Sequence, residues 1–217
     1  MNSYQNKYPV IAIDGTASSG KGTLAKNLSK VFGFDHLDSG ILYRIYAYEI
    51  LKNKVKEITN IKVNFISSKN LNSYNQKDLR TESVSKIASE IAKNNFVRKQ
   101  LIDIQRNFAD DPPNKKGSVI DGRDITSVII PNAEVKFYVD ASLDKRAKRR
   151  QIQLNLTDKE YEKIFTEMKS RDHNDKNRRN SPLIKTNDSF FIDTSDISEK
   201  EVLDIAIEEI KKKIDFI

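Results

Sequence analysis

The chain has 217 residues, with 38 Lys and Arg against 31 Asp and Glu, two His and no Cys. This length predicts one domain with an appendage or two small domains, with enough chain to bury a hydrophobic core. The absence of Cys excludes disulfides, thiolate catalysis and Cys-based metal sites, and two His are too few for a His-based metal site. No apolar run approaches a membrane span and no signal peptide is apparent, so we expect a cytoplasmic protein.

The formal net charge of +7 is consistent with a Lys-rich solvated surface or with a basic cleft for phosphates or nucleic acid. Lys residues are scattered, but Arg residues concentrate in the segments Arg146–Arg150 and Arg171–Arg179. Because guanidinium groups suit planar anions such as phosphate, this distribution favours a local anion site.

The first predicted element is a strand at Val10–Ile13, followed by Asp14, a loop of small residues and a helix at Lys21–Phe32. The loop and helix start match a phosphate-binding loop, in which backbone N–H groups surround a polyphosphate and the helix dipole adds positive charge. We expect Lys21 to reach the β- and γ-phosphates. The expected ATP-binding residues of this stretch are Gly15, Thr16, Ala17, Ser18, Ser19, Gly20, Lys21, Gly22 and Thr23.

The helix at Lys21–Phe32 places Leu24, Leu28, Val31 and Phe32 on one face, and Gly33 ends it. A second short strand is predicted at Phe34–Leu37, and Asp38-Ser39-Gly40 caps the next helix. The polar region Lys52–Arg80 predicts a small hairpin insertion, with a strand at Ile61–Ile66 and a return at Leu71–Tyr74.

Two helices are then predicted at Thr81–Asn94 and Asn95–Phe108. In the rest of the chain, strands are predicted at Ser118–Ile120, Val135–Val139 and Phe190–Ile192. Helices are predicted at Ser142–Leu154, Asp158–Ser170 and Ser198–Phe216. Short apolar strands that alternate with helices indicate an α/β fold, a five-stranded parallel sheet with helices on both faces.

Polar residues follow four of the predicted strands, namely Asp14, Asp38-Ser39, Asp121–Asp124 and Asp140. Ligands of such sheets bind beyond the carboxyl ends of the strands. We therefore expect these four strand ends to form one shared site.

In its motifs the chain resembles the bacterial cytidylate kinases, a group of the nucleoside monophosphate kinases. The matching segments occur in the family's order and are Ile13-Asp-Gly15, Gly20-Lys-Gly-Thr23, Leu37-Asp-Ser-Gly-Ile-Leu-Tyr-Arg44, Val119-Ile-Asp-Gly-Arg-Asp-Ile125, Val135–Ser142, Arg146–Arg150, Arg171–Asp175 and Asn177-Arg178. One departure is Thr126-Ser127, where the family pattern usually has Gly-Thr after Asp-Gly-Arg-Asp-Ile.

The resemblance implies three parts. These are a core P-loop domain at 1–38, 109–155 and 183–217, an NMP-binding domain at 39–108 with the insertion at about 52–80, and a lid at 156–182. It also implies transfer of the ATP γ-phosphoryl group to CMP or dCMP, with Mg²⁺.

The resemblance further assigns roles to individual residues. Ser89, Arg98 and Asp124 fall on family positions that read the cytosine. The expected CMP-binding set is Ser39, Arg44, Ser89, Arg98, Arg123, Asp124, Arg171, Asp175 and Arg178.

Phosphoryl transfer to an acceptor that is already ionised needs positioning and positive charge more than acid–base catalysis. We expect Lys21, Arg123, Arg171 and Arg178 to supply that charge. On the helix after Ser142, Arg146 and Arg150 lie at positions i and i+4, and so are expected to reach the ATP phosphates from the lid side. Thr23 is expected to bind Mg²⁺ directly or through water, with Asp121 as a more distant partner.

Other functions stay open at this stage. The acceptor of a small-molecule P-loop kinase could equally be AMP or UMP, and the positive charge would also suit a nucleic-acid-binding NTPase. Helicase-type and RNA-binding motifs are not recognised in the sequence. We therefore expect ATP and CMP or dCMP as partners of a monomer, without stable nucleic-acid or membrane association.

Overall fold

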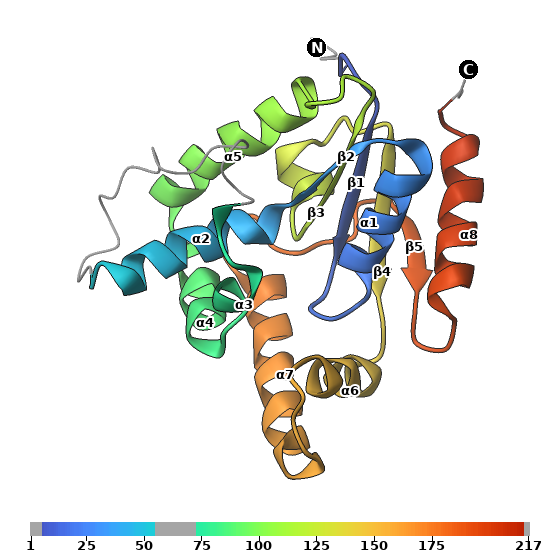
Figure 1. The fold of residues 1–217 in the computed structure, drawn as a ribbon. Helices are drawn as coiled ribbons and strands as arrows, with labels where there is room; N and C mark the ends of the chain where they lie inside the picture. The colour runs from blue at the N-terminus through green and yellow to red at the C-terminus, as the bar shows by residue number, and fades with distance from the viewer. Residues whose placement is uncertain (1–5, 55–72, 215–217) are drawn as a thin grey trace.

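A computed structural model describes residues 6–54 and 73–214. Its centre is a five-stranded parallel sheet of order β2-β3-β1-β4-β5, shown in Figure 1. The strands are β1 (Val10–Gly15), β2 (Asp35–Asp38), β3 (Ser118–Gly122), β4 (Val135–Asp140) and β5 (Phe190–Asp193). All five predicted strands are confirmed, and several extend by one or two residues at their carboxyl ends.

The helices are α1 (Lys21–Phe32), α2 (Ser39–Lys52), α3 (Gln76–Leu79), α4 (Glu82–Ile91), α5 (Asn95–Asp110), α6 (Leu143–Gln153), α7 (Tyr161–Asn177) and α8 (Glu199–Lys211). A π-helical segment, η3 (Ile125–Ile129), follows β3, and a short 3₁₀ turn, η4 (Asp158–Glu160), precedes α7. Within the described residues, no helix combines the length and apolar character that a membrane span requires.

Alternate residues of β1 face opposite sides of the sheet, as the strand period of two requires. Ile11 and Ile13 pack with α1 and α8, whereas Val10 and Ala12 pack with α5 and η3. Figure 1 shows α1 and α8 on one side of the sheet and α5 on the other. Both faces are therefore covered, and the ligand site is left to the carboxyl edge.

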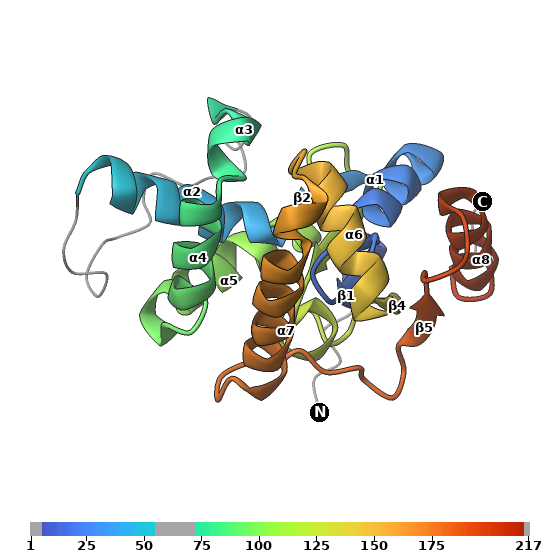
Figure 2. The same ribbon diagram turned by 90° about the horizontal axis from the view of Figure 1, so that it is seen from below.

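A second hydrophobic cluster joins α2, α4 and α5 beside the sheet. Its members Tyr46 and Leu79 are fully buried. A smaller cluster joins Ala17 of the phosphate loop to α6 and α7 through Ala147, Ile164 and Met168. In Figure 2, α7 lies between α4 and α6, across the carboxyl edge of the sheet.

The buried face of one helix and the ends of two others were predicted wrongly. Val31 is 51% exposed, and Ala25 rather than Val31 completes the buried face of α1. The helix predicted at Asp158–Ser170 continues to Asn177. The last helix ends at Lys211 rather than Phe216.

The predicted hairpin at 61–74 lies, except for its last two residues, outside the described residues. Further along the insertion the structure has α3, a single helical turn that the polar sequence did not predict. Asn75 caps this turn, and Leu79 anchors it to the cluster of α2, α4 and α5.

Candidate active site

The loop between β1 and α1 is shaped by its small residues. A Cβ atom at Gly15 would lie 2.0 Å from the Val139 carbonyl oxygen, so only glycine allows this approach between neighbouring strands. Gly20 has φ of 90°, a left-handed conformation that suits glycine, and it is the N-cap of α1. Among the described residues, no side chain caps this helix start and its first turn has no acidic residue. The N–H groups and positive dipole end of α1 are thus free for an anion.

Lys21 extends from this helix start into the same space. Its Nζ atom donates to the Thr16 carbonyl oxygen at 3.1 Å. Burial, and then the positive charge of Arg123, lower the pKa of Lys21 to about 7. The environment of Lys21 therefore disfavours its charged ammonium form, and an anion bound beside it would stabilise that form.

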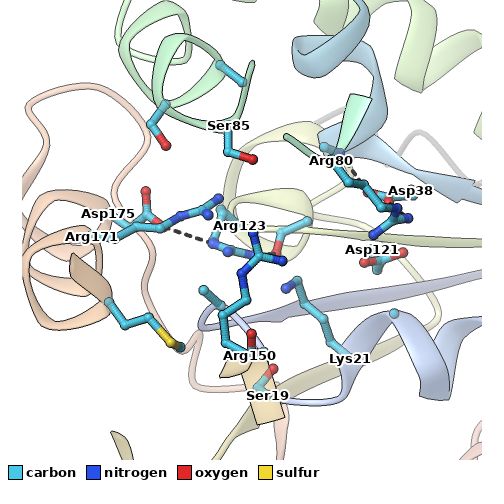
Figure 3. Close-up of a pocket in the computed structure, with 18 of the residues that line it drawn as sticks. Ser19, Lys21, Asp38, Arg80, Ser85, Asp121, Arg123, Arg150, Arg171 and Asp175 are labelled. Carbon is cyan, nitrogen blue, oxygen red and sulfur yellow. Dashed lines mark hydrogen bonds and ion pairs between the residues drawn. The ribbon is translucent and has the colours of Figure 1, made fainter. Parts of the chain in front are cut away.

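The loop opens into a cleft of about 1530 Å³ whose wall comes from β2, β3, α1, α2, α4, α5, α6 and α7. This volume exceeds that of an ordinary single-ligand pocket. Figure 3 shows Lys21, Arg123 and Arg150 directed into the same space from three segments of the chain. The predicted residues Ser39, Arg44, Ser89, Arg98, Asp124, Arg171, Asp175 and Arg178 also line the cleft.

Arg123, Arg171 and Asp175 form one group on the wall opposite the loop. Arg123 Nε donates to Asp175 Oδ2 at 2.9 Å, and Arg171 Nε lies 4.0 Å from the same oxygen (Figure 3). Burial, and then the charge of Arg123, lower the pKa of Arg171 to about 10. One carboxylate is thus shared by two guanidinium groups, which leaves net positive charge toward the cleft.

Arg98, Asp124 and Arg178 form a second, more deeply buried group. Arg98 pairs with Asp124, and its Nη1 donates to the Tyr43 hydroxyl at 3.3 Å. Arg178 Nη2 lies 3.6 Å from the other carboxylate oxygen of Asp124, while its Nε donates to the Ser181 carbonyl at 2.5 Å. Arg98 is 3% exposed, so this group is a fixed part of the cleft floor.

Arg44 is held by two contacts from the α3 and α4 region. It donates to the Leu79 carbonyl at 3.2 Å and to Ser85 Oγ at 2.9 Å. Burial lowers the pKa of Arg44 to about 10. Arg80 lies 3.8 Å from Asp38 at the end of β2, and both line the cleft. Arg80 was not predicted from the sequence, because nothing in the polar insertion distinguishes it from its neighbours.

The two arginines predicted to act together on α6 point in different directions. Arg150 lines the cleft, but Arg146 is 4% exposed and does not. Arg146 instead contacts Ala17, Ala141 and Asp172.

The neighbouring Arg149, missed from the sequence, does line the cleft. It donates to Thr194 Oγ1 at 2.9 Å and to the Thr194 carbonyl at 2.5 Å, and Thr194 Oγ1 donates to the Ser19 carbonyl at 2.8 Å. The run of Arg residues was the sequence signal for an arginine of α6 in the cleft. Helical spacing does not show which positions of such a run pack inward.

Two of the four strand-end carboxylates do not face the cleft, contrary to expectation. Asp14 is fully buried and accepts from the backbone N–H groups of Ile125 at 2.9 Å and Thr126 at 2.8 Å, and from Thr126 Oγ1 at 2.7 Å. Asp140 accepts from the Thr16 hydroxyl and from the Ala141 N–H. Asp14 therefore fixes the start of η3, and the side chain of Thr126, at a position where the family pattern usually has glycine, supplies one of these three bonds.

We expect Thr126→Val to lower the free energy of unfolding by about 1–3 kcal/mol at pH 8 and by less at pH 5. Burial raises the pKa of Asp14 from 3.8 to about 6, so the folded state loses stability as pH rises from about 4 to about 6, and above that range the carboxylate is charged. The Thr126 hydroxyl stabilises the charged form, and its loss matters most where that form prevails. Urea unfolding at both pH values measures the difference.

The control is Thr157→Val, which removes an exposed hydroxyl bonded to Glu160. Equal losses for Thr126→Val at pH 5 and pH 8 would contradict the role given to Asp14.

Buried donors of the cleft remain without hydrogen-bond partners among the described residues. They include Arg171 Nε, which lies 4.0 Å from Asp175 Oδ2, and Arg178 Nη2, which lies 3.6 Å from Asp124 Oδ1, so each is at ion-pair distance from a carboxylate. The loop hydroxyl Ser19 Oγ also lacks a hydrogen-bond partner. Unsatisfied buried donors are rare in folded proteins and need an explanation. These atoms are buried, so their side chains would have to turn before an anion in the cleft reached them.

The comparisons with known proteins agree with this geometry. The family model described as cytidylate kinase matches residues 11–212. A cytidylate kinase of Paramagnetospirillum magneticum is 37% identical over 202 residues, which cover 91% of this chain and 95% of that protein. A cytidylate kinase of Bartonella bacilliformis is 39% identical over 195 residues, covering 88% and 89%.

Among solved structures, an uncharacterized protein from Eubacterium ventriosum matches with a TM-score of 0.56 at 16% identity. The match covers 94% of this chain and 98% of that one. This likeness concerns the fold alone. The sequence matches span nearly the whole chain at well above 30% identity, and the chain belongs to the cytidylate kinase family.

Proposed function

We propose that the protein transfers the γ-phosphoryl group of ATP to CMP or dCMP, giving ADP and CDP or dCDP. One observation carries this proposal beyond family membership. The phosphate loop with Lys21 shares one cleft with the guanidinium groups of Arg44, Arg123 and Arg171. A cleft with an anion site at each end suits a reaction between two phosphate-bearing molecules.

The chemistry requires two anions to approach and their shared charge to be stabilised as the phosphoryl group moves. The N–H groups of the loop and Lys21 hold the β- and γ-phosphates of ATP, with Arg149 and Arg150 nearby on α6. Arg44, Arg123 and Arg171 hold the acceptor phosphate, and its ionised oxygen attacks without a general base. The attacking oxygen and the γ-phosphorus then lie between Lys21 and Arg123, where the positive charge is concentrated.

The acceptor base belongs on the buried side of the cleft. The ion pair between Arg98 and Asp124 supplies fixed donors and acceptors there, and Ser89 lines the same region. Asp175, between Arg123 and Arg171, is placed to accept from the acceptor's sugar. A polar group that loses its partner on binding the wrong base is a strong basis for selection.

Mg²⁺ is expected with ATP, and two residues fit it. A Cβ atom at Gly22 would lie 3.7 Å from Asp121 Oδ2, so this carboxylate faces the helix start that bears the exposed Thr23. Asp121 also contacts His36 Nε2 at 2.7 Å, which fixes its orientation. Mg²⁺ commonly binds through few protein oxygens, with phosphates and water as its other ligands. When bound, it would neutralise phosphate charge, with Thr23 and Asp121 holding it directly or through water.

We also propose the division into parts expected from the sequence. Residues 39–108 carry the acceptor-binding helices α2, α4 and α5, and residues 156–182 form the lid around α7. The separate hydrophobic cluster of α2, α4 and α5 supports the first of these parts, whereas α7 shares its cluster with α6 and with Ala17 of the phosphate loop.

The proposed function is tested by coupled assay of CMP, dCMP, UMP and AMP as acceptors, with MgATP as donor. We expect the highest kcat/KM with CMP or dCMP. Preference for AMP or UMP would overturn the assignment of the acceptor. ATP hydrolysis stimulated by single-stranded RNA, without formation of any nucleoside diphosphate from these acceptors, would favour a nucleic-acid-binding NTPase.

We expect ATP binding to take up a proton at pH 8 but not at pH 6. The lowered pKa of about 7 leaves Lys21 mostly neutral at pH 8 in the free protein, and the bound phosphates restore its charge. Uptake should be roughly 0.9 proton per ATP at pH 8. Calorimetry of MgATP binding without acceptor, in two buffers of different ionisation enthalpy, measures it.

The matched variant is Lys21→Met, which should abolish the uptake. An uptake that persists in this variant, or that is equal at pH 6 and pH 8, would assign the proton to another group.

A further inference from the structure

Helix α7 presents two adjacent faces to two different partners. Arg171, Asp175 and Arg178 line the cleft. Asp172 contacts Arg146 of α6, and Ile164 and Met168 pack in the cluster with α6 and the phosphate loop. Residues 164, 168 and 172 repeat at four-residue intervals, which places them on one side of the helix. The direction of Arg171 therefore depends on how the neighbouring Asp172 is held.

Arg146 holds Asp172 and contacts the phosphate loop with the same guanidinium group. Its Nη2 lies 2.6 Å from Asp172 Oδ2, and its Nη1 donates to the Ala17 carbonyl at 3.3 Å. Its Nε donates to the Ala141 carbonyl at 2.8 Å and lies 3.6 Å from Asp140 Oδ1. One planar group thus connects α7, the phosphate loop and the end of β4.

Asp140 completes the connection from the other side. It accepts a hydrogen bond from the hydroxyl of Thr16, the residue whose carbonyl accepts from Lys21. Hydrogen bonds and ion pairs therefore connect Lys21 to Arg171 through residues that do not line the cleft, namely Thr16, Asp140, Arg146 and Asp172.

Stability alone does not explain this arrangement. Arg146 is 4% exposed and Asp172 is 9% exposed. A buried ion pair is often no more stable than apolar residues of similar volume in the same place. A planar guanidinium does, however, fix the geometry of the groups that it joins.

We propose that Arg146 and Asp172 are positioning residues, which hold the phosphate loop and the cleft-facing arginines of α7 in one fixed frame. Neither residue lines the cleft. Their effect on catalysis rests on the proposed function, because they align the γ-phosphate at the loop with the acceptor phosphate at Arg171. Their effect on the relative placement of α1 and α7 does not depend on the reaction.

The first experiment measures that placement directly in the whole chain. Because the protein has no Cys, Lys30→Cys on α1 and Lys169→Cys on α7, both exposed, give one pair of spin labels. We expect a narrow distance distribution without ligand in this background, and a clearly broader one after adding Asp172→Asn. An unchanged distribution in Asp172→Asn would overturn the proposal whether or not the protein phosphorylates CMP.

The second experiment separates positioning from stability in the kinetics. We expect Asp172→Asn to lower kcat by roughly ten- to a hundredfold, because small misplacements of reacting groups have large effects, while both KM values change less than about threefold. The double variant Arg146→Met/Asp172→Leu should recover much of the melting temperature but not kcat. Recovery of kcat together with stability would make the pair merely structural and overturn the proposal.

The matched control is Asp144→Asn. Asp144 on α6 accepts from the Tyr161 hydroxyl at the start of α7 at 2.6 Å, so this variant also breaks a polar contact between the two helices. That contact is exposed and does not reach the phosphate loop, so the distance distribution and kcat should stay as in the unaltered protein. Equal effects of Asp144→Asn and Asp172→Asn would show that any contact between α6 and α7 suffices, and would overturn the role of Arg146.

Discussion

Lys21→Ala should lower kcat for CMP phosphorylation on the order of 10²–10³-fold and leave the protein folded. The ammonium group is the cation that α1 itself brings to the β- and γ-phosphates. Folding should not suffer, because the lowered pKa of Lys21 means that its free surroundings already disfavour the charge. Steady-state kinetics and thermal unfolding measure the two effects.

Lys30→Ala is the matched control, since Lys30 lies exposed in the last turn of the same helix. It should keep both the activity and the melting temperature. Near-normal turnover of Lys21→Ala would remove Lys21 from the transfer step, and a melting temperature far below that of Lys30→Ala would make its role structural.

Arg98→Met should raise the KM for CMP by roughly ten- to a hundredfold and weaken discrimination against UMP, with a smaller effect on the KM for ATP. The substitution also leaves Asp124 buried, with Arg178 at 3.6 Å as its remaining cationic neighbour. We therefore expect a loss of about 3 kcal/mol in the free energy of unfolding as well. The ratio of kcat/KM for CMP and UMP, with urea unfolding in parallel, gives both values.

Arg106→Met is the control on the same helix. Arg106 donates to the Val128 and Ile129 carbonyls at 3.1 and 2.9 Å and does not line the cleft. It should lose stability without any change in acceptor selection. If Arg98→Met also keeps its preference for CMP over UMP, then Arg98 supports the fold of this region but does not read the base.

Because Arg98 has buried contacts, we expect its substitution to affect both folding and the binding of CMP. The sequence indicated a residue that reads the base, and in the structure that residue is at the same time half of a buried ion pair. A substitution at this position therefore tests binding and folding together, so the stability measurement has to accompany the kinetics.

The sequence by itself determined the order of strands and helices and the position of the phosphate loop. These follow from local chemistry. Apolar runs bounded by turn residues form the strands, Asp38 and Ser198 cap helices through their own side chains, and Gly20 supplies the left-handed conformation at the loop. Motif order then assigned the family, and the comparisons confirmed it.

The tertiary structure alone decided which charged residues face the cleft. Arg146, Arg149 and Arg150 are close in sequence and alike in chemistry, yet one is buried against the loop while the other two line the cleft. Asp14 likewise ends a strand at the site edge, yet η3 takes both of its oxygens. Local pattern gives the face of a helix or the end of a strand, whereas the direction and partners of a side chain depend on elements that are distant in sequence and meet only on folding.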